Sequence, residues 1–214
     1  MTIQHHLSDR LLLAYSAGQL PEAFNLLAAA HISLCDECRA RLGSYDAVGG
    51  AMVESADTVA LSDGCLEAMM ARINKIEPEK ATPVVAPKGV LPAPLHDYIG
   101  GDLASVRWRP LGMGVRQAIL PTARDASARL LYIPAGAALP DHGHRGTELT
   151  LVLQGGFRDE GDHFGVGDLE IADQAMEHTP VADTGVDCIC LAATDAPLRF
   201  TGMLPRLLQP FFRI

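Results

Sequence analysis

The sequence predicts an α + β protein of two domains, in which an N-terminal module of four helices is followed by an antiparallel β-barrel. Three observations lead to this fold class. Before residue 77, apolar residues recur at helical spacing. Residues 77–94 contain five prolines and show no period, which is typical of an extended linker. Beyond them, short apolar runs alternate with Gly, Pro and Asp, which is typical of strands joined by turns.

Length and composition limit the classes of protein that fit. The 214 residues are enough for two modest domains, and the net charge of -9 argues against direct DNA binding, which needs a basic surface. No apolar run reaches membrane-spanning length and no secretory signal is evident, so we expect a cytoplasmic protein without membrane contact. Five cysteines, an odd number, favour a metal or redox role over a disulfide framework.

The four helices are predicted from their end signals and their apolar spacing. Ser8 can cap a first helix that ends at Gly18, and Pro21 opens a second. A third runs from the cysteines near residue 35 to about residue 49, and Ser62 caps a fourth that ends near residue 74. The residues expected on inward faces of the first two helices are Leu11, Leu12, Tyr15, Phe24, Leu27 and His31.

These patterns predict a helical domain over residues 1–80, a proline-rich linker over 81–94, and a β domain over 95–214. The expected strands contain the runs VRQAIL, ARLLYI, TELTLVL, LEIA and CICLAAT. The closing stretch, LPRLLQPFFRI, is apolar enough to be a tail packed on the barrel.

A metal site is predicted in the helical domain by the spacing HxxxCxxC, formed by His31, Cys35 and Cys38. Residues three or four apart share one helix face, so these three side chains converge, and their chemistry suits zinc. A structural zinc site needs a fourth ligand. His5 or His6 can supply it if the first two helices are antiparallel, and we favour His6. A thiol redox pair is the alternative, but no strand precedes the CxxC as in thioredoxin-like motifs.

With its upstream histidine, this helical HxxxCxxC module resembles the zinc-binding anti-sigma factors. His6, His31, Cys35 and Cys38 match the ligand positions of that family. The resemblance implies that the module wraps a sigma factor of the extracytoplasmic-function group and blocks its use of core RNA polymerase.

A second metal site is predicted in the β domain, where GAALPDHGHRGTELTLVLQG contains His142, His144 and Glu148. Alternate residues of a strand share a face, so the two imidazoles point together, and Glu148 can approach from beyond the turn at Gly146. His178 lies on a later strand that can close the site. Three imidazoles and a carboxylate suit zinc or another divalent metal.

This stretch resembles the first cupin motif, with both glycines, HxH and the glutamate in register. The second cupin motif is partial: His178 is present, but the Pro-Gly turn is missing and Ala182 stands where asparagine is common. The resemblance implies a cupin-like barrel. A metal-free cupin with solvated histidines is the alternative.

Other cysteines and histidines carry weaker signals. Cys188 and Cys190 form CxC on a strand, facing the same side, and are either a redox-responsive pair or two small buried residues. Cys65 is expected in the core. The remaining expectations are surface positions for His96 and His163, and either a supporting role or solvent exposure for Glu177.

Together, the two modules resemble the ChrR-type anti-sigma factors. That resemblance implies a non-enzymatic protein in which the first domain sequesters a sigma factor, in a 1:1 complex, and the second permits release in response to singlet oxygen or related oxidants. The alternative from another class is a cupin metalloenzyme, a dioxygenase or isomerase, with an accessory helical zinc module. A metal-storage or metal-sensing protein is a third hypothesis, which predicts weak, reversible binding.

Overall fold

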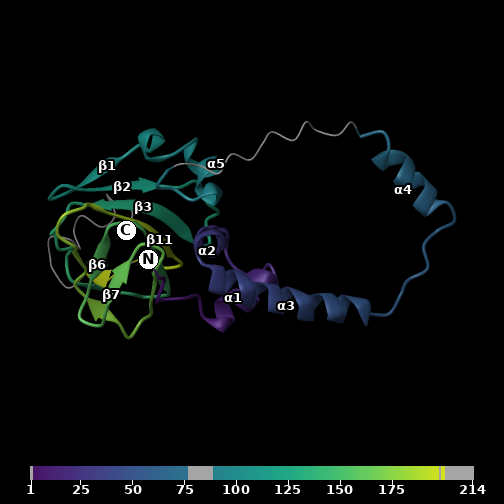
Figure 1. Cartoon of the computed structure of the whole chain (residues 1–214), viewed down its shortest axis with the longest axis horizontal. Helices are drawn as coiled ribbons and strands as arrows, with labels where there is room; N and C mark the ends of the chain where they lie inside the picture. Colours follow the sequence, from purple (N-terminus) through teal and green to yellow (C-terminus); the bar gives the residue numbers. More distant parts are fainter. Residues whose placement is uncertain (1, 77–88, 198, 201–214) are drawn as a thin grey trace.

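A computed structural model describes residues 2–76, 89–197 and 199–200 (Figure 1). Most of the expected linker and the apolar C-terminal tail therefore lie outside the described residues. Within the described residues, no helix is both long and apolar enough to cross a membrane. The α-helices are α1 (Asp9–Ser16), α2 (Glu22–Leu34), α3 (Asp36–Glu54), α4 (Cys65–Ile73) and α5 (His96–Ile99), with 3-10 turns η1 (Ala93–Leu95) and η2 (Leu103–Ser105).

The first two helices form as their end signals predict. The Ser8 hydroxyl accepts a hydrogen bond from the backbone N–H of Leu11 at the start of α1, and Gly18 adopts a left-handed φ of 64° beyond its end. Pro21 precedes α2 directly. Most of α2 is buried, including the expected His31, because this helix lies between the other helices and the sheet.

The third and fourth helices differ from expectation. α3 continues to Glu54, beyond the predicted end near residue 49. The N-cap residue of α4 is Gly64, which has a left-handed φ of 76° and no side chain to cap the helix. The predicted side-chain cap by Ser62 is therefore wrong. No residue of α4 is buried, and α4 stands apart from the other helices (Figure 1). Cys65, at its start, is only partly buried, so its expected place in the core is also wrong.

The β domain contains the five runs predicted as strands, all in one six-stranded antiparallel sheet of order β1-β2-β3-β11-β5-β8. Two three-stranded sheets, β10-β6-β7 and β12-β4-β9, complete a sandwich. The domain is thus an open sandwich rather than a closed barrel, which agrees with the expected antiparallel β domain; the two- and three-residue strands are too short to continue one ladder around it. The bounds are β1 (Arg109–Gly112), β2 (Val115–Ile119), β3 (Ser127–Ile133), β4 (His142–Gly143), β5 (Glu148–Gln154), β6 (Gly156–Arg158), β7 (His163–Gly165), β8 (Leu169–Ala172), β9 (Glu177–His178), β10 (Val181–Ala182), β11 (Cys188–Thr194) and β12 (Arg199–Phe200).

The two faces of the six-stranded sheet belong to different cores. One face packs on α2, and their shared apolar cluster joins Leu27 of α2 to Leu130, Leu151 and Leu191 of the sheet. The other face encloses a smaller cluster inside the sandwich. Leu91, near the end of the expected linker, is buried in the shared cluster. The helical and β parts are thus held together by one continuous apolar core.

Candidate metal centres

The HxxxCxxC residues meet at the junction of α2 and α3. His31 lies in the last turn of α2, and Cys35 is the extended residue between the helices. The Cys35 sulfur accepts the backbone N–H of Cys38 at 3.4 Å, so Cys35 also acts as the N-cap of α3. The tight turn between the helices therefore directs three ligand side chains to one point.

The distances between these ligand atoms fit a tetrahedral zinc site. Nε2 of His31 lies 3.3 Å from the Cys38 sulfur, and Nδ1 of His6 lies 3.3 Å from the sulfur of Cys35 and 3.7 Å from that of Cys38. Usual Zn–N and Zn–S bond lengths place tetrahedral ligands about 3.3–3.8 Å apart. All four ligand atoms lie within 4.8 Å of one another. The residues therefore fit a structural zinc ion, which would tie the N-terminal segment to the α2–α3 turn.

The structure selects between the two N-terminal histidines. His6 faces the cysteines, and its Nε2 lies 3.4 Å from a carboxylate oxygen of Glu37, which orients the ring. His5 turns away and places its Nε2 3.0 Å from Asp162 in the β domain. His6 is thus the histidine that completes the four-residue group.

Burial shifts the pKa values of a histidine and a cysteine of this group in opposite directions. It lowers the pKa of His31 to about 4, so the imidazole is neutral and able to bind a metal at neutral pH. It also raises the pKa of the Cys38 thiol to about 11. A divalent ion would supply the positive charge that stabilises the thiolate in this buried position.

The second centre lies at the end of the sandwich formed by β4 and β9. These strands pair antiparallel with His142 opposite His178, and His144 follows β4 directly. Nε2 of His178 lies 3.2 Å from Nε2 of His142 and 3.3 Å from Nε2 of His144. The three imidazoles are almost fully buried, with exposed fractions of 5% or less. Their spacing fits three ligands of one divalent metal.

In each of these imidazoles, Nδ1 is turned away from the shared centre. Nδ1 of His142 lies 2.9 Å from the Pro140 carbonyl. Nδ1 of His178 lies 3.0 Å from Glu170 and 3.2 Å from Asp159. Such partners orient the rings so that Nε2 faces the shared centre. Burial lowers the pKa of His142 and of His144 to about 4, so both rings are neutral.

Glu148 lies beside the three imidazoles and outside the group of mutually close ligand atoms. One of its carboxylate oxygens is 3.7 Å from Nδ1 of His144, and the other accepts the Thr150 hydroxyl at 3.3 Å. Burial, together with the nearby charge of Glu170, raises the pKa of Glu148 to about 7. Its role as a metal ligand stays a prediction.

Two carboxylates at this centre were missed by sequence analysis. Asp159 lies just after β6, and Glu170 is a buried residue of β8. Burial opposes the charged form of His178, but these carboxylates outweigh it and raise the pKa of His178 to about 9. One signal was available: Glu170 is a charged residue within the apolar run LEIA, where an acidic side chain needs a buried partner.

Known proteins resemble the chain along its whole length. A family model described as the ChrR cupin-like domain matches residues 97–196. The anti-sigma-E factor ChrR of Cereibacter sphaeroides is 64% identical over 214 residues, covering 100% of both chains. The chain belongs to the ChrR family of anti-sigma factors. The crystal structure of Rhodobacter sphaeroides SigE in complex with the anti-sigma ChrR matches with 62% identity and a TM-score of 0.79, covering 91% of this chain and 100% of that one.

In this ChrR-family chain the CxC pair lies inside the sandwich. The sulfurs of Cys188 and Cys190 are 3.4 Å apart, and both side chains belong to the interior apolar cluster. Contact with Cys188, and then burial, raises the pKa of Cys190 well above its usual range. Both cysteines are therefore buried free thiols, and the redox role of the pair stays a prediction.

The remaining candidates lie apart from both centres. His163 is exposed, as expected, and pairs with Asp183 at 2.7 Å. His96 is only partly exposed because its Nε2 lies 3.1 Å from the Leu91 carbonyl. Glu177 is exposed on β9, which agrees with the solvent-facing alternative.

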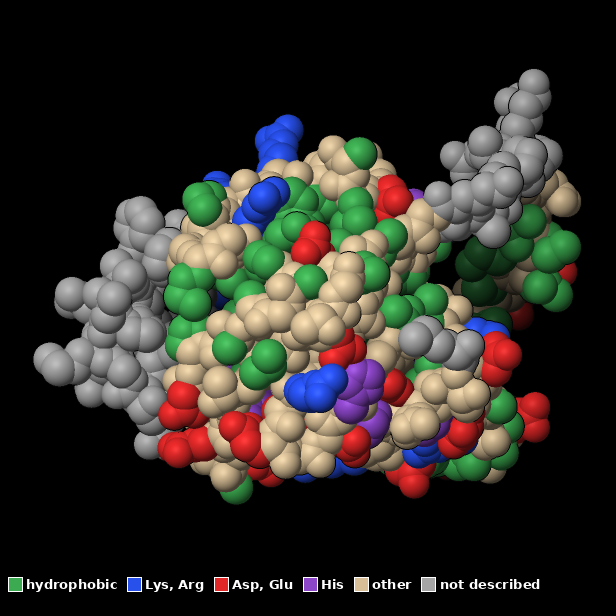
Figure 2. Space-filling model, turned by 60° about the vertical axis from the view of Figure 1, so that its left-hand side comes forward, with side chains coloured by type: hydrophobic (Ala, Val, Ile, Leu, Met, Phe, Trp, Pro, Cys, Tyr) green, Lys and Arg blue, Asp and Glu red, His purple; other side chains and the backbone are tan. Residues whose placement is uncertain are grey.

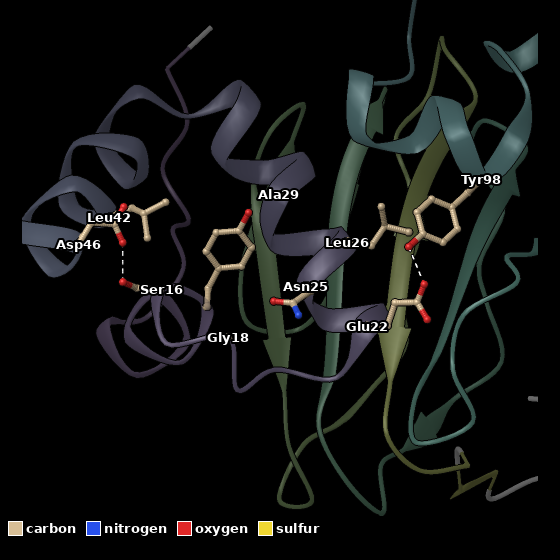
Figure 3. Close-up of a pocket in the computed structure, with 10 residues that line it drawn as sticks. Ser16, Gly18, Glu22, Asn25, Leu26, Ala29, Leu42, Asp46 and Tyr98 are labelled. Atoms are coloured by element: carbon tan, nitrogen blue, oxygen red, sulfur yellow. Dashed lines mark hydrogen bonds between the residues drawn. The ribbon is translucent and has the colours of Figure 1, made fainter. Parts of the chain in front are cut away.

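A surface cleft of about 530 Å³ lies where the helices of this ChrR-family chain meet α5 (Figure 3). At one edge the Tyr98 hydroxyl donates to the Glu22 carboxylate at 2.7 Å, and the same carboxylate accepts the Ala123 backbone N–H. None of the residues lining this cleft belongs to either metal centre. The cleft therefore marks the junction between the helices and the β domain.

Proposed function

We propose that this chain is an anti-sigma factor that binds and inhibits a sigma factor of the extracytoplasmic-function group through its helical module. The complex would be 1:1, and the chain would act in the cytoplasm, where sigma factors meet RNA polymerase. Its role would be regulatory rather than enzymatic. The observation that carries the proposal is the 64% identity, over both full chains, to an anti-sigma-E factor.

Exposed apolar side chains on α4 support a protein-binding role. Leu66, Met69, Met70 and Ile73 recur at i, i+3, i+4 and i+7, so they form one apolar face, and each is about half exposed or more. No residue of α4 is buried within the described chain. An amphipathic helix whose apolar face is exposed is typical of a segment that docks on a partner protein.

The end of α3 offers a second such surface. Val48, Met52 and Val53 are 60%, 68% and 76% exposed. α3 and α4 are separated by residues 55–64, and α4 stands away from α3 (Figure 1). A sigma factor held by both surfaces would be contacted from two sides, which supports the proposed masking of its polymerase-binding surface.

The charge of the molecule is compatible with this partner and not with DNA. Figure 2 shows acidic side chains along the lower edge of one face, with histidine side chains among them. The net charge of the chain is -9. An acidic surface repels phosphate and can instead cover the basic surface of a DNA-binding partner.

We further propose that the cupin-like domain governs release in response to singlet oxygen or related oxidants. Its metal, zinc or another divalent ion, would hold His142, His144 and His178 together. The oxidisable pair Cys188 and Cys190 lies on β11, the strand whose other face belongs to the core shared with α2. A change of packing there can reach the helical module, and weakening the complex by about 1.4 kcal/mol would release tenfold more partner.

Binding can be tested with purified full-length chain and the SigE protein of Rhodobacter sphaeroides as the probe. We expect a 1:1 complex by size-exclusion chromatography with light scattering, and inhibition of SigE-dependent transcription in vitro. No complex and unchanged transcription would contradict the anti-sigma function.

Release can be tested in cells that report SigE activity before and after singlet oxygen exposure. We expect His142→Ala, His144→Ala or His178→Ala to retain inhibition but to lose the response. Variants that no longer bind SigE at all would contradict the division of roles between the domains. The competing hypothesis, a cupin metalloenzyme, predicts iron or manganese in the second centre, which elemental analysis of the purified chain would detect.

A further inference from the structure

The segment that carries His6 is attached to the β domain rather than to the helices. The backbone N–H groups of Gln4 and His5, the two residues before His6, donate to the same carboxylate oxygen of Asp168, at 2.6 Å and 2.9 Å. The His5 carbonyl in turn accepts the backbone N–H of Leu169 at 3.2 Å. Residues 4–5 thus bind to the turn between β7 and β8 through three backbone hydrogen bonds.

Side-chain contacts of Ile3 and His5 also hold this segment against the β domain. The Ile3 side chain lies close against Gly167, where an added Cβ would come within 2.6 Å of it. Gly167 also has a left-handed φ of 89°, which glycine adopts without strain. The His5 ring packs on Phe164 with centroids 4.5 Å apart.

The Asp168 carboxylate is buried and oriented for this contact. Its side chain is 9% exposed, and its second oxygen accepts the backbone N–H of Gly165, which fixes the carboxylate within its own turn. Burial would raise the pKa of Asp168, but the backbone donors of His5, Gln4 and Gly165 outweigh it and lower the pKa. The carboxylate is therefore charged, and hydrogen bonds to an ionised acceptor are the stronger kind.

We propose that Asp168 is a positioning residue for the N-terminal metal centre, because it holds the segment that brings His6 to Cys35 and Cys38. His6 precedes α1, so no helical hydrogen bonds of its own order the backbone there. Fixing a free segment costs backbone conformational entropy. The hydrogen bonds to Asp168 order this segment before the metal binds. The β domain is thereby part of the proposed zinc site of the helical domain.

The inference rests on the proposed zinc site and is tested on the full chain loaded with Co²⁺. Thiolate-to-cobalt charge-transfer absorption reports the centre with Cys35 and Cys38 and not the imidazole centre. The measured quantity is the rate at which excess EDTA removes this absorption. We expect Asp168→Asn and Asp168→Ala to raise that rate about tenfold or more, with the larger effect for alanine.

Asp187→Asn is the matched control, because this carboxylate accepts a hydroxyl and a backbone N–H elsewhere in the β domain. A wild-type release rate in both Asp168 variants, or an equal acceleration in Asp187→Asn, would overturn the inference. Amide exchange at residues 4–6 should also rise in Asp168→Asn while the melting temperature of the chain stays near wild type. Two variants separate the two claims: if Cys35→Ser leaves the charge-transfer absorption unchanged, the proposed metal site itself is wrong, and if His6→Ala leaves the release rate at the wild-type value, His6 is not a ligand.

Discussion

At the scale of single residues, the two candidate centres differ in how their imidazoles are supported. In the imidazole centre, His178 has two carboxylates on its Nδ1, and these come from different strands or turns. In the cysteine centre, Glu37 on α3 supports His6. Such partners orient a ligand and raise its basicity, so they determine how tightly a metal is held. Two predictions follow at this scale.

Replacing Glu170 by Gln should weaken metal binding at the imidazole centre roughly 10- to 100-fold. The amide keeps the size of the carboxyl group but removes the charge that favours the orienting N–H of His178. Competition with a chromophoric chelator measures the affinity. Glu177→Gln is the control, since Glu177 is next to His178 but exposed. Equal affinities for Glu170→Gln and wild type would contradict the supporting role of Glu170.

Replacing Cys38 by Ser should remove zinc from the N-terminal centre and unfold the helical module. A structural zinc site contributes about 10–16 kcal/mol of apparent binding free energy, which in a small module acts as folding free energy. We expect loss of one zinc per chain, lower helical circular dichroism and loss of SigE inhibition. Cys65→Ser should change none of these, because Cys65 lies on α4 away from the centre. A zinc-free Cys38→Ser variant that inhibits normally would refute the expectation.

At the scale of elements, α2 and α4 differ in whether their apolar residues are buried. Both contain apolar residues at helical spacing, but α2 is buried between α3 and the sheet whereas no residue of α4 is buried. Hydrophobic spacing alone is the same for a core helix and for a docking helix. The partner of α4 therefore has to be sought outside the described chain.

Replacing Leu66 and Met70 by Ser should leave the free energy of unfolding within about 0.5 kcal/mol of wild type, because both side chains are exposed in the free protein. The same change should weaken SigE binding at least tenfold, or about 1.4 kcal/mol. Calorimetric titration measures the second effect and denaturant unfolding the first. Glu67→Gln, an exposed change on the same helix, is the control. Unchanged affinity would exclude α4 from the interface.

At the scale of the whole molecule, α2 makes the helical and β parts one folding unit. Leu27 is fully buried in the apolar cluster that α2 shares with the sheet. Glu22 adds polar contacts to Tyr98 and Ala123 of the β part. The Asp168 contact to residues 4–5 adds a third link. A change in either part is therefore transmitted through direct contacts.

Replacing Leu27 by Ala should lower the free energy of unfolding by about 2–5 kcal/mol, because it leaves a cavity in the shared core. Unfolding should remain a single transition when it is followed both by helical circular dichroism and by the fluorescence of Trp108, which lies in the β part. Leu13→Ala, at a site that is 52% exposed, should cost far less. Separate transitions for the two probes in the wild type would show that the parts unfold independently.

Features that depend on residues near one another along the chain were predictable from the sequence. Most helices and the main strands follow from apolar spacing, and the pairing of His142 with His144 follows from alternation along a strand. The HxxxCxxC spacing brings His31, Cys35 and Cys38 together, although Cys35 lies between two helices rather than on one helix face. Those contacts are set by local backbone geometry, so periodicity and cap residues are enough to predict them. The fold class and the ChrR-type resemblance came from these same short motifs.

Contacts between residues far apart in the sequence became visible only in the folded structure. It selected His6 over His5, brought Asp159 and Glu170 to His178, and arranged the strands as an open sandwich. It also joined His5 to Asp168 across 163 positions of sequence. Such contacts depend on how whole elements pack, and a single sequence carries no periodic signal for them. The link between the candidate metal centre at Cys35 and Cys38 and the β domain therefore exists only in the folded chain.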